Sequence, residues 1–260
     1  MSDPLHGYTL PLSPQGRSSF VAPPPWHFSG ELLFVEFRVP EEAAARFLPP
    51  ELEHGPDLGL AAAVFTDSQS CSDGGEEFLD PVRSQFKEFY VLLACRHRGR
   101  PAARCAFMWV DKPFSLVRGW IQGLPKKHGS LWMTKPVALG RAGPRLEPGG
   151  RFAATVATDD RRLAEATVEL REVVDEPPVL HRTPVVNTRL FPAWGDATSE
   201  LRETILSVSV QETGTVWRGD ATLRFFDAPA EELSDLAPTE VLHGYRFAYA
   251  NTLIAAAPAD

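Results

Sequence analysis

The stretch QFKEFYVLLACRHRGRPAARCAFMWVD, residues 85–111, holds two apolar runs joined by a connection that contains glycine. This pattern predicts a β-hairpin. Glu88 stands at the head of the first apolar run, residues 89–95. We expect its carboxylate to be partly buried, with a raised pKa, and able to shuttle a proton; the alternative is a surface acid at the end of a strand.

Further strand-like runs lie on both sides of this hairpin, with turn residues between them. They cover residues 30–39, 58–67, 149–158, 165–174 and 204–226, and a last apolar segment ends near residue 257. Short helices are expected at 40–52 and 228–241, and loops at 68–84 and 136–150. The chain shows no alternation of strands with long helices. It therefore predicts a mainly β (α+β) fold, an antiparallel sheet closed into a barrel or cone with a few short helices outside.

The 260-residue chain carries a net charge of −8, which argues against partners such as nucleic acid or an anionic membrane, because both require a basic face. No apolar run has the length of a transmembrane helix, and the first 20 residues lack the apolar core of a signal peptide. The cysteines and histidines lack metal-ligand spacing, so no metal is expected. We expect a cytoplasmic protein with an N-terminal arm, residues 1–22, and one catalytic domain, residues 23–260.

The segment WIQGLPKKHGS, residues 120–130, contains two of the chain's five lysines side by side. A free lysine amine has a pKa of about 10.4 and is protonated at neutral pH. Burial or a neighbouring cation lowers that pKa, and the neutral amine can then form a Schiff base with a ketone. Apolar neighbours such as Trp120 and Leu124 could bury Lys126, and Lys127 could supply the second charge. The alternative is that both lysines lie in a solvated turn.

The sequence allows two arrangements of the Lys126 and Lys127 side chains. If the segment is extended, consecutive side chains point to opposite faces, and Lys127 then faces away from Lys126. Desolvation would be the larger cause of a lowered pKa in that case. If Pro125 bends the chain, both amines could share one pocket.

The order of these features resembles the acetoacetate decarboxylase superfamily. The resemblance extends from about residue 26 to about residue 251, nearly the whole chain. It rests on GLPKKHG (123–129), which matches a small-x-Pro-Lys-Lys signature, and on MWVDKPFSLV (108–117), PPELE (49–53) and LRFFDAPAEELSDLAPTEV (223–241). The resemblance implies a lyase that needs no cofactor and acts on a small keto acid. It also implies a homo-oligomer, because members of the family tend to associate.

Transferred residue by residue, the resemblance makes Lys126 the Schiff-base nucleophile, Lys127 its companion and Glu88 an active-site glutamate. The chain also departs from the pattern. It has Arg118, Gly119 and Trp120 where the decarboxylases have Gly-Arg-Glu. No arginine stands at residues 29–31, and an alanine-rich stretch near residue 61 replaces a second glutamate. These losses make the site more apolar and disfavour acetoacetate itself.

The departures leave three functions open. The first is decarboxylation of a small keto acid, and the second is an aldolase-dehydratase reaction that condenses pyruvate with an aldehyde through the same lysine. In either case Gln122 could hold a substrate carboxylate or a water, and Tyr249 or Tyr245 could donate a phenolic proton; the alternative for both tyrosines is ordinary packing. The third is a non-catalytic or cyclase-like pocket for an apolar ligand, shaped by the ring of Trp120.

Overall fold

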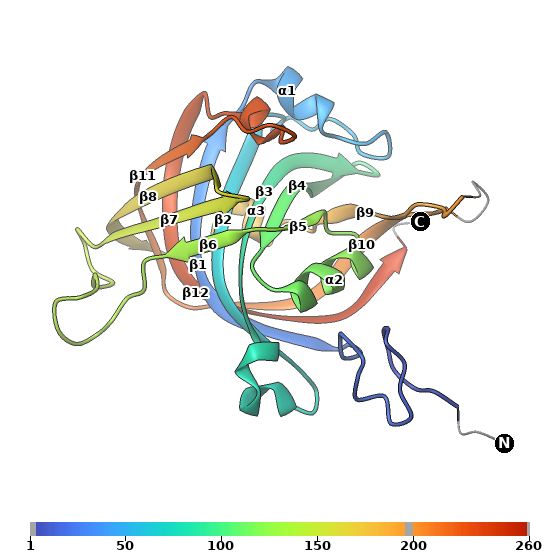
Figure 1. Cartoon of the computed structure of the whole chain (residues 1–260). Helices are drawn as coiled ribbons and strands as arrows, with labels where there is room; N and C mark the ends of the chain where they lie inside the picture. The colour runs from blue at the N-terminus through green and yellow to red at the C-terminus, as the bar shows by residue number, and fades with distance from the viewer. Residues whose placement is uncertain (1–3, 196–199, 259–260) are drawn as a thin grey trace.

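The computed structural model describes residues 4–195 and 200–258, so the expectations for residues 1–3, 196–199 and 259–260 lie outside the described residues (Figure 1). Its strands form one twelve-stranded sheet in this part of the chain, with the path β5-β4-β3-β2-β1-β12-β11-β8-β7-β6 and with β10 and β9 added beside β12. The strands are β1 Trp26–Arg38, β2 Leu60–Ser72, β3 Gln85–His97, β4 Arg100–Val110, β5 Lys126–His128, β6 Ser130–Met133, β7 Arg151–Thr158, β8 Arg161–Val174, β9 Val186–Phe191, β10 Leu201–Thr213, β11 Val216–Phe225 and β12 Glu240–Pro258. The helices are α1 Glu41–Arg46, α2 Pro113–Ile121 and α3 Val179–Arg182, with 3-10 turns η1 Glu76–Leu79, η2 Pro81–Arg83 and η4 Leu233–Leu236.

The sheet curls until its two ends meet. β5 and β6 are the last strands of the path, yet only Gly129 separates them in sequence. All pairings are antiparallel except that of β5 with β4. The curled sheet with few helices confirms the predicted fold class (Figure 1).

The hairpin of residues 85–111 is present as β3 and β4, and it shows how the sheet uses its two faces. Phe89, Val91 and Leu93 point into the barrel core, which β1, β2 and β6–β8 also line. Leu92 points to the opposite face and belongs to a second cluster with Leu32, Phe34 and Leu180. This alternation follows from the two-residue period of a strand. The chain therefore carries apolar clusters on both faces of one sheet, and Leu180 of α3 packs into the second.

Three segments differ from the sequence expectations. Residues 113–121 form α2, a helix that was not expected, and its buried positions are Ser115, Arg118 and Gly119. Residues 68–72 continue β2 rather than opening a loop, and Ser68 and Ser70 are buried there. The helix expected at 228–241 is reduced to the single turn η4, because prolines stand on both sides of it. No helix in the described ranges is long and apolar enough to cross a membrane.

Candidate active site

The local chain path fixes the direction of the lysine doublet. Helix α2 ends at Ile121, Gly123 closes the following turn with a φ of 75°, and the Leu124 N–H donates to Gly119 O at 2.8 Å. Pro125 then leads into β5, which pairs in parallel with β4 and places Lys126 beside Met108. Because β5 is extended, Lys126 is buried and Lys127 is exposed on the other face.

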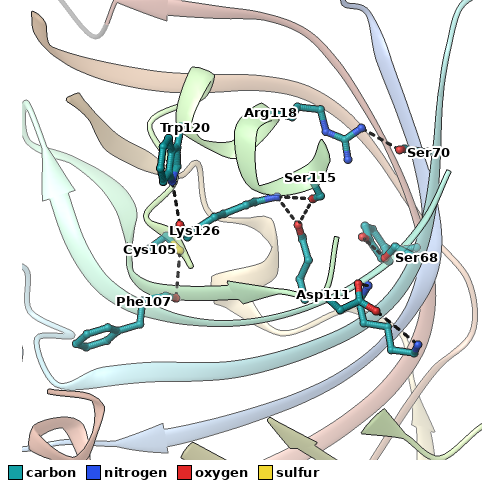
Figure 2. Close-up of polar contacts among 12 residues, drawn as sticks. Ser68, Ser70, Cys105, Phe107, Asp111, Ser115, Arg118, Trp120 and Lys126 are labelled. Atoms are coloured by element: carbon teal, nitrogen blue, oxygen red, sulfur yellow. Dashed lines mark hydrogen bonds and ion pairs between the residues drawn. The ribbon is translucent and has the colours of Figure 1, made fainter. Parts of the chain in front are cut away.

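Lys126 Nζ meets one carboxylate and one hydroxyl. It forms a buried ion pair with Glu88 Oε1 and lies 2.9 Å from Ser115 Oγ. The Ser115 hydroxyl in turn donates to Glu88 Oε1 at 2.8 Å, so the three groups form a closed triangle (Figure 2). Glu88 is therefore placed to accept a proton from the lysine.

The helix α2 lies directly against the lysine side chain. A Cβ at Gly119 would stand 2.2 Å from Lys126 Cδ, so only glycine leaves room for the extended lysine. Burial lowers the pKa of Lys126, and the positive charge of Arg118 lowers it further, whereas Glu88 opposes both effects. The neutral amine that Schiff-base chemistry requires is thus favoured by desolvation and by Arg118 rather than by Lys127.

Arg118 is the main polar group of the site that sequence reasoning missed. Its guanidinium is buried, packs 4.5 Å from the ring centroid of Phe28 and donates from Nη1 to Ser70 Oγ at 2.8 Å. Its Nε and Nη2 donate to no acceptor within the described residues. Burial lowers the pKa of Arg118 to about 10, so it remains charged at neutral pH. The sequence signal was an arginine eight positions before Lys126 in an otherwise apolar segment.

These groups face one cavity of about 490 Å³. Its lining includes Lys126, Glu88, Arg118, Gln122 and Tyr249. The Tyr249 hydroxyl shares a hydrogen bond of 3.0 Å with Ser68 Oγ, and burial raises the pKa of Tyr249 to about 12. The structure therefore brings four of the six predicted site residues together and adds Arg118.

Lys127 and Trp120 are placed differently from the expectation. Lys127 pairs with Glu231 and lies 5.0 Å from the ring centroid of Trp109, outside the cavity lining. Trp120 is about half exposed, and its indole N–H donates to the backbone oxygen of Lys126 at 2.8 Å. Lys127 points away because side chains alternate along the extended β5, whereas Trp120 lies on a side of helix α2 that is not buried. The predicted pocket for an apolar ligand depended on the ring of Trp120, and that ring does not line the cavity.

Tyr245 also lies away from the lysine, since its hydroxyl donates to Glu36 at 2.9 Å. No cluster of three or more histidine, cysteine or acidic side chains that could hold a metal occurs in residues 4–195 and 200–258.

Comparison with known proteins gives a family and several similar structures. The family model for acetoacetate decarboxylase matches residues 9–259. The enduracididine biosynthesis enzyme MppR, complexed with the condensation product of pyruvate and imidazole 4-carboxaldehyde, is 45% identical, with a TM-score of 0.95 over 100% of this chain and 98% of that chain. MppR complexed with pyruvate is 44% identical, with a TM-score of 0.94 over 99% and 98% of the two chains.

An acetoacetate decarboxylase-like enzyme from Sphingomonas wittichii RW1 is 25% identical, with a TM-score of 0.90 over 97% of this chain and 98% of that chain. No curated protein sequence gave a significant match. The family match confirms the resemblance seen in the lysine signature and the predicted enzyme class, a lyase that works through a lysine Schiff base. By its sequence from residue 9 to residue 259 and by its fold, this chain belongs to the acetoacetate decarboxylase family.

Proposed function

We propose that the protein condenses pyruvate with an aldehyde and removes water from the product, with Lys126 as the Schiff-base nucleophile. The observation that carries this proposal is the buried Lys126–Glu88–Ser115 triangle in one cavity with the unpartnered edge of Arg118. The complexes of MppR with pyruvate and with a pyruvate condensation product support the same chemistry.

Arg118 supplies the carboxylate site. Its free Nε–H and Nη2–H groups lie on one edge of a planar guanidinium, which matches the two oxygens of a carboxylate. Gln122, one turn further along the chain, lines the same cavity and is placed to donate to that carboxylate or to the carbonyl oxygen. Pyruvate held in this way presents its carbonyl carbon to Lys126.

The condensation begins at the neutral amine of Lys126. Lys126 Nζ attacks the carbonyl carbon of pyruvate, and water leaves as the iminium forms. The methyl carbon gives a proton to Glu88 and becomes an enamine, which bonds to the aldehyde carbon while the aldehyde oxygen takes up a proton. That hydroxyl then leaves with a proton from the former methyl carbon, as a second water. Hydrolysis of the iminium consumes one water and releases an unsaturated keto acid and free Lys126.

Arg118 favours condensation over decarboxylation. A β-keto carboxylate loses its charge as carbon dioxide departs, so a buried cation that stabilises this charge raises the barrier. The carboxylate of pyruvate keeps its charge through the whole condensation. A buried guanidinium therefore favours the condensation of pyruvate and disfavours the decarboxylation of a β-keto acid.

Decarboxylation of a β-keto acid is the second candidate, because the matching family is named for it. The two reactions differ in their products. Incubation with acetoacetate should release no carbon dioxide above the uncatalysed rate, whereas pyruvate with an aldehyde should give a conjugated product that absorbs in the near ultraviolet. Enzymatic release of carbon dioxide would reverse the order of the two candidates.

Reductive trapping tests the nucleophile itself. With pyruvate and cyanoborohydride, the wild-type protein should gain the mass of one reduced pyruvate adduct, and peptide mapping should place it on Lys126. Lys126→Met should gain nothing, and Lys127→Met, the matched control on the other face of β5, should gain the adduct as the wild type does. An adduct that persists in Lys126→Met would refute the assignment.

We also propose a cytoplasmic, homo-oligomeric protein with residues 1–22 as an arm on one catalytic domain. All three cysteines are free thiols, which suits a reducing compartment. The arm exposes Leu5, Leu10 and Phe20, which a neighbouring copy could cover. Light scattering should show a multimer for the full chain and a smaller species after removal of residues 1–22; a monomeric full chain would refute the proposal.

A further inference from the structure

A second pair of polar residues lines the cavity. His181 on α3 and Asn251 on β12 both belong to the cavity wall. His181 Nε2 and Asn251 Oδ1 are buried and make no hydrogen bond within the described residues. His181 lies next to Tyr249, with ring centroids 6.3 Å apart, so this second group adjoins the lysine end through that tyrosine. Neither atom has a part in the reaction steps on pyruvate.

The imidazole of His181 is held in place and uncharged. Its ring stands edge-on to Phe34 and Phe247, with centroids 6.4 and 5.0 Å away. Burial lowers the pKa of His181 to about 4, and the charge of Arg182 acts in the same direction. At neutral pH the ring is therefore a fixed, neutral hydrogen-bonding group.

The charges around the cavity exclude a cationic occupant at this end. Glu88 is the single carboxylate in the described lining, and Lys126 already pairs with it. Arg182 lines the cavity beside His181 and pairs with Glu176 at 2.9 Å, so no unpaired carboxylate in the described lining is left for a second cation. Asn251 Oδ1 can only accept a hydrogen bond, so its partner must be a donor. The complementary group is thus a donor without charge.

From this arrangement we infer that the second substrate is an aldehyde carrying an uncharged hydrogen-bond donor, which Asn251 Oδ1 and His181 Nε2 bind. The inference rests on the proposed condensation with pyruvate. Pyruvate has three carbons and fills only a small part of a cavity of about 490 Å³, which leaves room for the aldehyde. With Nε2 unprotonated, both atoms are acceptors: a single donor pairs with one of them, whereas an aldehyde without a donor pairs with neither and is bound less well for that reason.

Substituted benzaldehydes test the inference with pyruvate as the partner. The 3- and 4-hydroxy compounds carry an uncharged donor, their methoxy analogues carry none, and 3-(trimethylammonio)benzaldehyde carries a permanent cation. The readout is the ratio of kcat/KM for each hydroxy compound to that for its methoxy analogue, because comparison of this ratio between protein variants cancels the intrinsic reactivity of the aldehydes.

The variants are His181→Phe, which keeps the packing of the ring, and Asn251→Leu, which keeps the size of the side chain. His243→Phe is the matched control, because His243 is exposed and stands outside the cavity lining. We expect the ratio to fall roughly three- to tenfold in each of the first two variants and to stay at the wild-type value in the control. The cationic aldehyde should react no better than the methoxy compounds.

Equal ratios in the wild type and in both cavity variants would overturn the inference. Preference for the cationic aldehyde would also overturn it. So would the absence of product from every aldehyde in a protein that forms the pyruvate adduct. The trapped adduct, measured in each variant, reports whether the variant is folded and whether the lysine works. If the wild type forms no adduct with pyruvate, the proposed function fails; if the adduct forms but the ratios do not change, the aldehyde inference alone fails.

Discussion

At the scale of single residues, Lys126 has a pKa set by opposing neighbours. Burial is the largest cause and lowers the pKa, Arg118 lowers it as well, and Glu88 raises it. Lys127, the adjacent cation in sequence, lies on the far side of β5. The charge that favours the neutral amine therefore comes from a helix residue eight positions earlier.

Removal of each neighbouring charge should move the pH profile in opposite directions. Without the negative charge in Glu88→Gln, the pKa of Lys126 falls further and the amine is neutral at lower pH. Without the positive charge in Arg118→Gln, the pKa rises. We expect shifts of about one pH unit each way in the rate of cyanoborohydride trapping with acetone, a ketone without a carboxylate. Shifts in the same direction would contradict this account.

The variant Arg118→Lys should separate the effect of the positive charge from that of the planar pair of N–H donors. Lysine keeps a positive charge but loses the planar pair of donors, so the variant should raise KM for pyruvate by roughly 10- to 100-fold. Trapping of acetone, which does not use the guanidinium edge, should proceed near the wild-type rate. An unchanged KM for pyruvate would show that the substrate carboxylate binds elsewhere.

At the scale of elements, helix α2 makes room for the Lys126 side chain because residue 119 is a glycine. Gly119→Ala should push the lysine out of line, because the new Cβ would stand 2.2 Å from Lys126 Cδ. We expect kcat to fall by about 100-fold, the cost of a displacement of about 1 Å in a reacting group. Gly74→Ala is the matched control, since a Cβ there meets only Glu76 Cγ at 3.9 Å. A wild-type kcat in Gly119→Ala would refute the steric argument.

The elements that the sequence predicted are those with a repeating apolar pattern. The hairpin of β3 and β4 was predicted because its apolar runs are long, and the Pro-Lys-Lys signature singled out Lys126, which the structure buries. Helix α2 was missed because its buried positions are Ser115, Arg118 and Gly119 rather than apolar residues. Arg118 was missed for the same reason, since its role depends on Ser70 and Phe28, which are distant in sequence.

At the scale of the whole molecule, one sheet serves two purposes. Its inner face closes over the barrel core, and its other face forms a wall of the cavity, which residues of α2, α3 and β10 also line. Adjacent residues on one strand therefore belong to different parts of the protein. Leu93 is fully buried in the barrel core, whereas Leu92 on the same strand lines the cavity.

This division predicts that stability and selectivity can be changed separately on β3. Leu93→Ala should lower the free energy of unfolding by about 2–5 kcal/mol, because it leaves a void in a packed core, and should leave the aldehyde selectivity of the folded protein unchanged. Leu92→Ala adds its lost volume to an existing cavity, so it should destabilise the protein less and raise kcat/KM for bulky aldehydes relative to small ones. Urea unfolding and paired aldehyde kinetics measure both effects. If Leu93→Ala changed the selectivity as much as Leu92→Ala, the two faces of the sheet would be coupled, and core and cavity would not be separate.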